Sequence, residues 1–98
     1  MTELTRTISI LGIPHTIEEV DVVDKFNPSN GLIEYQACTI KIDRNLPLEM
    51  KNRVLIHEIV HDIFSLLGYN EGAENEQKVQ GIATALHLLL KSSDPIFS

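Results

Sequence analysis

A change of hydrophobic period at Pro47 constrains the fold of this chain more than any other feature. Before Pro47, apolar and polar residues alternate in short runs separated by turn residues, which is typical of β-strands. After it, apolar residues recur at the three-to-four-residue spacing of helices. A chain of 98 residues has the size of one domain. We therefore expect a single α+β domain over residues 1–98, with a β-rich part at 1–46 and helices at 47–67 and 73–91.

The β-rich part predicts a small antiparallel sheet of three or four strands. Thr7–Leu11 alternates polar and apolar residues, and Gly12-Ile13-Pro14 has the composition of a turn. Residues 6–23 therefore resemble a hairpin. One or two further strands are expected within 32–35 and 37–42.

The predicted helix at 47–67 is framed by Pro47 at its start and Gly68 just beyond its end. Apolar residues surround most of this helix, so we expect it to be largely buried and to pack on the sheet. Its polar residues share one narrow arc, in which Asp62 and Ser65 either line a cleft or are simply solvated. The arc consists of Lys51, Glu58, Asp62 and Ser65.

Composition excludes several classes of protein. Eight Lys and Arg against fourteen Asp and Glu give a net charge of −6, and no basic cluster is present, so we expect no nucleic-acid or membrane partner. The single Cys38 cannot form an internal disulfide. No apolar run approaches the length of a membrane span, and the first residues do not resemble a signal peptide. These features favour a soluble intracellular protein.

The sequence His57-Glu58-Ile59-Val60-His61 is the most informative motif. Histidines four residues apart on a helix project from one face, where two imidazoles can reach a single tetrahedral Zn²⁺. Glu58 lies further round the helix, in a position to act as general base on a metal-bound water. Because apolar residues flank the motif, unpaired histidines there would be costly, which favours metal ligands over ordinary histidines.

A catalytic zinc site needs a third protein ligand, and the second predicted helix offers Glu76. Helical phase places Glu76 at the edge of the apolar stripe, facing inward, whereas Glu74 and Glu71 are expected to be solvated. The alternative is that Glu76 only interacts favourably with the helix N-terminus.

Three stretches of the chain resemble the ImmA/IrrE-like metallopeptidases, and more closely their small phage- and mobile-element-encoded members. The resemblance is specific in the two helical motifs and weak in the strand–turn–strand. These stretches are Leu55–His61, Asn75–Ala83 and Ile8–Ile17.

The resemblance implies a minimal zincin-like fold with His57, His61 and Glu76 as metal ligands and Glu58 as general base. It also implies a bacterial or phage origin and a cytoplasmic setting. The implied substrate is a regulatory protein such as a helix-turn-helix repressor. In larger zincins an Asp four residues after the Glu ligand often orients a ligand histidine; Gln80 stands there in this chain.

Two other functions remain open. A chain this short has little wall for a substrate cleft, so it could be a catalytically inactive, metal-stabilised module that sequesters a regulator. In a third hypothesis the protein binds no metal, and His57 and His61 belong to a polar network in the core.

The remaining polar residues are expected to be structural. His15 follows Pro14 in the predicted turn and is expected at the surface, and His87 lies too far along its helix to share the metal. Cys38 is expected to be a small buried residue in a strand. Zinc hydrolysis also needs a hydrogen-bond donor to the oxyanion that develops, and Tyr35, Tyr69, His15 and His87 are the candidates for that role. We expect the strand at 39–42 to be an edge that receives an extended peptide.

Overall fold

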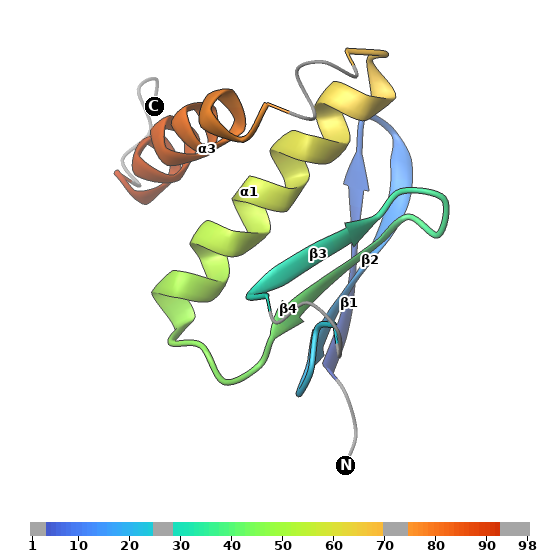
Figure 1. Ribbon diagram of the computed structural model, residues 1–98, viewed down its shortest axis with the longest axis vertical. Coiled ribbons are helices and arrows are strands. Elements are labelled where there is room, and N and C mark those ends of the chain that lie inside the picture. Colours follow the sequence, from blue (N-terminus) through green and yellow to red (C-terminus); the bar gives the residue numbers. More distant parts are fainter. Residues whose placement is uncertain (1–3, 25–28, 70–74, 93–98) are drawn as a thin grey trace, which may run out of the picture.

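The computed structural model describes residues 4–24, 29–69 and 75–92 and has an α+β fold (Figure 1). Four strands form one sheet in the order β1-β2-β4-β3, and α1 lies between this sheet and α3. The elements are β1 (Leu4–Ile10), β2 (Ile13–Val20), β3 (Gly31–Glu34), β4 (Thr39–Asp43), α1 (Leu48–Leu66) and α3 (Glu76–Lys91).

The sheet is mixed, so the expectation of a purely antiparallel sheet was wrong. β1 pairs with β2 and β3 with β4 in antiparallel fashion, whereas β2 and β4 run parallel. The chain passes from β2 to the outer strand β3 and then turns back, which inserts β4 between β2 and β3. β4 is therefore a central strand, and the expected peptide-binding edge at 39–42 is not an edge.

The hairpin turn begins one residue earlier than the sequence predicts. Leu11 and Gly12 form it, both with positive φ (51° and 81°), which matches the twist of a two-residue hairpin loop. Pro14 is consequently part of β2, opposite Ser9, and His15 follows it in the strand instead of lying in a turn.

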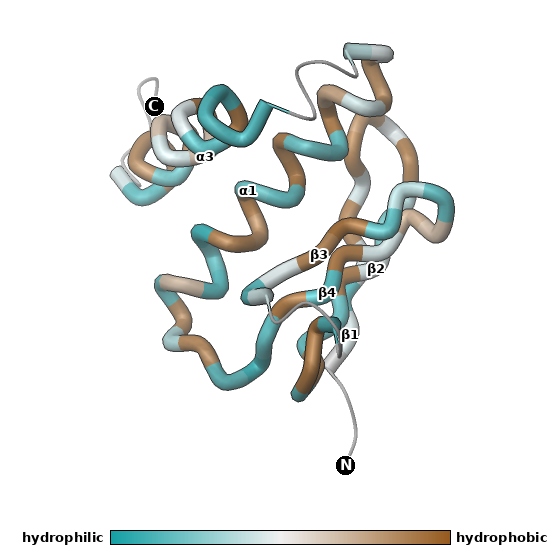
Figure 2. The backbone as a smooth tube through the Cα atoms, viewed as in Figure 1, coloured by the Kyte–Doolittle hydropathy of each residue, from teal (hydrophilic) through white to brown (hydrophobic). Residues whose placement is uncertain are grey.

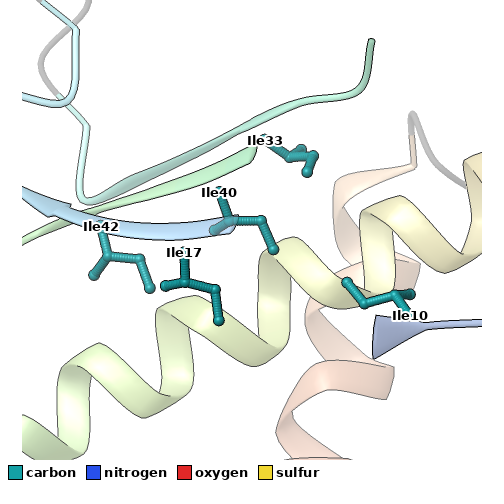
Figure 3. Packing of buried hydrophobic residues seen from close by; sticks show 5 residues of the cluster. All are labelled: Ile10, Ile17, Ile33, Ile40 and Ile42. Atoms are coloured by element: carbon teal, nitrogen blue, oxygen red, sulfur yellow. The ribbon is translucent and has the colours of Figure 1, made fainter. Parts of the chain in front are cut away.

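α1 is apolar on two sides because it is the middle layer, but the expectation of a largely buried helix was wrong: Val60 is its only fully buried apolar residue, and Leu48 is 74 % exposed. One side packs on a core to which every strand contributes an isoleucine (Figure 3). Val60 on the other side packs against Val79 and Ala83 of α3. Figure 2 shows apolar residues recurring along α1. The isoleucines that face α1 from the sheet are Ile10, Ile17, Ile33, Ile40 and Ile42.

The ends of α1 agree with the predicted range 47–67. Pro47 caps the N-terminus, and Gly68, at φ +80°, ends the helix with a reversal in which Tyr69 N–H donates to Phe64 O at 2.8 Å. α3 begins at Glu76 after the cap Asn75; residues 73 and 74 of its predicted range lie outside the described residues, as do Glu71 and Glu74. Neither described helix has the length and apolar character needed to cross a membrane.

Candidate metal centre

His57, His61 and Glu76 converge where α3 crosses α1. Their ligand atoms all lie within 4.8 Å of one another, so this group could hold a metal ion. His57 Nε2 is 3.1 Å from Glu76 Oε2, and His61 Nε2 is 2.7 Å from Glu76 Oε1. The two imidazoles, one helical turn apart, thus present the same nitrogen to the two oxygens of one carboxylate.

Glu76 reaches the histidines from solvent, not from the apolar stripe as predicted. Its side chain is 68 % exposed, whereas that of His61 is 9 % exposed. Asn75 accepts a hydrogen bond from Lys78 N–H at 3.0 Å and so caps α3 immediately before Glu76. The cap places Glu76 in the first turn, where the helix passes α1.

Gln80 determines which nitrogen of His57 faces the centre. Its Oε1 lies 2.9 Å from His57 Nδ1, and its Nε2 donates to Thr84 Oγ1 at 3.2 Å. Because Oε1 can only accept, the His57 proton is on Nδ1 and the lone pair of neutral His57 is on Nε2. Gln80 therefore occupies the orienting position that the sequence left unassigned.

The donor set fits a small divalent cation. Tetrahedral coordination with bonds of 2.0–2.1 Å places ligand atoms about 3.3 Å apart. The two histidine–carboxylate separations are 3.1 and 2.7 Å, and all three ligand atoms lie within 4.8 Å of one another, so small side-chain shifts would bring them to that spacing. A lone pair on His57 Nε2 facing a carboxylate oxygen requires a positive charge between them, from a proton or a metal. Two imidazole nitrogens and one carboxylate are a ligand set of catalytic zinc sites.

Glu58 is adjacent to this group but does not belong to it. The residue is buried (9 % exposed) and lines a cleft of about 420 Å³ that His57 and Gln80 also border. Burial raises the pKa of the Glu58 carboxyl, although the neighbouring histidines oppose the rise. The cleft is lined by Ser29, Asn30, Gly31, Met50, Arg53, Val54, His57, Glu58 and Gln80.

Gly31 allows β3 to approach the helix beside Glu58. A Cβ at this position would collide with Val54 Cγ1 and would lie 3.5 Å from Glu58 Cγ. The close approach puts the start of an edge strand along the wall of the cleft. β3, not β4, is thus the exposed strand next to the candidate centre.

No family model, curated protein or solved structure matches the chain. The arrangement of its own residues is therefore the basis for any assignment of function.

His15 is buried, so its predicted surface position was wrong. It is 1 % exposed, and its Nε2 lies 2.6 Å from Asp62 Oδ2, a residue of the polar arc that is also 1 % exposed. Asp62 is therefore buried, and the alternative that it is simply solvated was wrong. A signal was present in the sequence, because His15 lies two residues before Ile17 and shares its side of the strand.

The other candidates lie away from the centre. His87 is buried, with Nε2 4.0 Å from Glu49 Oε1, and as expected it does not join the ligand group. Cys38 is a half-buried turn residue at φ +48°, so its expected place in a strand was wrong. Tyr35 and Tyr69 are exposed, and neither is among the described residues that line the cleft.

Proposed function

We propose that the protein is a zinc-dependent peptidase of the ImmA/IrrE-like type. The observation that carries the proposal is the convergence of His57 Nε2, His61 Nε2 and the Glu76 carboxylate beside a cleft that contains Glu58. Zinc bound there would polarise the scissile carbonyl and lower the pKa of a bound water.

The chain's own residues have separate tasks in this proposal. His57 and His61 hold the metal from one helix and Glu76 holds it from another, while Gln80 keeps the proton of His57 on the nitrogen that points away. The Glu58 carboxylate accepts the proton of the attacking water and returns it to the leaving amine. Burial in the cleft shields this carboxylate from bulk water.

The substrate in this proposal is an extended segment of a regulatory protein, such as a phage or mobile-element repressor in a bacterial cytoplasm. β3 supports an extended substrate, because it is an edge strand whose start borders the cleft. A peptide added to this edge would gain backbone hydrogen bonds and pass close to Glu58.

Elemental analysis and chelation test the metal centre. Purified protein should contain one zinc per chain, and a chelator should lower the melting temperature. A ligand present at 100 times its Kd stabilises a fold by about 2.7 kcal/mol, so the shift should be easily measured. The His57→Ala/His61→Ala double variant should contain no zinc and show no shift. Undiminished zinc in that variant would exclude this centre.

Glu58→Gln separates a peptidase from a module that binds metal and a regulator without cleaving it. In a peptidase the variant loses cleavage but keeps its zinc and its fold. Glu49→Gln is the matched control, because Glu49 is an exposed carboxylate of the same helix that does not line the cleft. If wild type and Glu58→Gln bind a regulator equally and neither cleaves it, the sequestering function replaces the peptidase.

A further inference from the structure

Arg53 is the only cation among the described residues that line the cleft. The other charged side chain of the lining is Glu58, which is buried, whereas Arg53 is exposed at the rim. The rest of the lining is neutral apart from His57. Arg53 is therefore the permanent positive charge that the described lining itself places at this entrance.

Arg53 makes no ion pair within 4.0 Å with any described residue, although the chain has a net charge of −6, and its charge acts on Glu49, one helical turn earlier, only at longer range. Most other described cations are paired with a carboxylate. An unpaired guanidinium beside a cleft is available to a ligand. The paired cations are Lys41 with Glu34, Arg44 with Asp21, Lys51 with Glu19 and Lys91 with Glu49.

Arg53 lies one helical turn before His57 on α1. It precedes His57 by four residues of α1, so the two lie on the same face, about 6 Å apart along the axis. An extended peptide advances about 3.3 Å per residue. A substrate group within two residues of the bond next to Glu58 therefore falls within reach of Arg53.

We infer that Arg53 selects substrates that carry a carboxylate within two residues of the scissile bond. This inference rests on the proposed peptidase function. The guanidinium matches a carboxylate with two parallel hydrogen bonds. The carboxylate is that of an Asp or Glu side chain or of the peptide's own C-terminus, and both present the same chemistry to Arg53.

Matched peptide libraries test this selectivity. Acetylated and amidated decapeptides of Ala, Leu, Ser and Thr carry a fixed central Glu, Gln or Lys, and a fourth library carries Gln with a free C-terminal carboxylate. Cleavage by the zinc-loaded protein is followed by mass spectrometry. Binding without cleavage is followed in zinc-loaded Glu58→Gln through the NMR signal of the Arg53 Nε–H group.

We expect about a fivefold to tenfold preference for Glu over Gln at low salt, which decreases as salt screens the exposed charge. Arg53→Gln should abolish the preference, and Arg53→Glu should transfer it to the Lys library. Arg6→Gln is the control, because it removes an exposed cation of β1 that does not line the cleft. Preference for the free C-terminus over internal Glu identifies the terminal carboxylate as the source.

The outcomes separate this inference from the proposed function. Cleavage with no carboxylate preference, or with a preference that survives Arg53→Gln, overturns the role of Arg53 and leaves the peptidase intact. Preferential binding of carboxylate peptides without cleavage by wild type overturns the peptidase and leaves the role of Arg53 in binding. Neither binding nor cleavage of any library overturns both.

Discussion

His15 Nε2 lies 2.6 Å from Asp62 Oδ2, and this fully buried contact joins β2 to the helix that carries His57 and His61. His15 Nδ1 donates to the Ile13 carbonyl at 2.7 Å, so the backbone of β2 holds the ring with Nε2 facing the carboxylate. Burial raises the pKa of Asp62, and His15 opposes the rise. The pair attaches α1 to the sheet immediately after His61.

Removing both partners should cost less than the sum of the two single removals. Asp62→Leu leaves a buried imidazole without its acceptor and should lower the free energy of unfolding by about 3 kcal/mol. The His15→Leu/Asp62→Leu double variant should lose at least about 1 kcal/mol less than the sum of the single variants. Urea denaturation of chelator-treated protein measures each value. Asp21→Ala removes the exposed partner of Arg44 in a long ion pair of 3.5 Å, and it should change stability by no more than about 0.5 kcal/mol.

Local sequence patterns were sufficient for the helices and for the grouping of His57, His61 and Glu76. Pro47 and Gly68 mark the ends of α1 because proline favours a first turn and glycine tolerates the positive φ of a helix end. The spacing of His57 and His61 determines their common face once the helix exists. Helical phase identified Glu76 as the third member of this group. It did not predict that the Glu76 side chain would be exposed to solvent.

The sheet order and His15 were missed because both depend on contacts between distant segments. Alternation identifies strands but does not specify their neighbours, and insertion of β4 beside β2 made the pair parallel. His15 was assigned to a turn because Pro14 was read as a turn residue. In the fold, Leu11 and Gly12 complete the reversal, and His15 faces α1 beside Ile17.

Gly31→Ala should disturb the cleft, whereas Gly81→Ala should not. A Cβ at position 31 collides with Val54 Cγ1, so the Val54 side chain, β3 or α1 must shift beside Glu58. We expect a loss of about 1–3 kcal/mol of stability, as for other overpacked positions. A Cβ on Gly81 of α3 meets nothing within 4 Å, and alanine should stabilise that helix by up to about 1 kcal/mol. Thermal denaturation compares the two, and equal effects would contradict the packing argument.

Glu49 should titrate below the ordinary range of a glutamate. Its pKa is lowered by the hydrogen bond and charge of Lys91, whose Nζ lies 2.5 Å from Glu49 Oε1 and joins the last turn of α3 to the first turn of α1. The native state then binds fewer protons than the unfolded chain between the two pKa values. The contribution of the pair to stability is present above the unfolded-state pKa and is lost as pH falls through the lower folded-state pKa.

NMR titration of the Glu49 carboxyl carbon measures this shift. Lys91→Gln should return the pKa of Glu49 toward its ordinary value, because the largest causes of the shift are then removed. Lys41→Gln removes a cation that pairs with Glu34 instead, and it should leave Glu49 unchanged. A Glu49 titration that is the same in wild type and Lys91→Gln would show that the ion pair does not form in solution.

Gln80 should act on the metal through His57 without touching the metal itself. Gln80→Leu removes the acceptor of His57 Nδ1–H, so the proton is free to move to Nε2, the nitrogen that faces Glu76. Loss of such an orienting partner typically weakens metal affinity by about 10–100-fold. Zinc competition titrations should show this loss. ¹⁵N NMR of the zinc-free protein should show His57 as the Nδ1–H tautomer in wild type and as a mixture of tautomers in the variant.

Thr84→Val is the control, because it removes only the partner of the Gln80 amide nitrogen, and it should have a smaller effect on both measurements. Unchanged zinc affinity and an unchanged tautomer in Gln80→Leu would mean that the imidazole is oriented by its packing and not by this hydrogen bond.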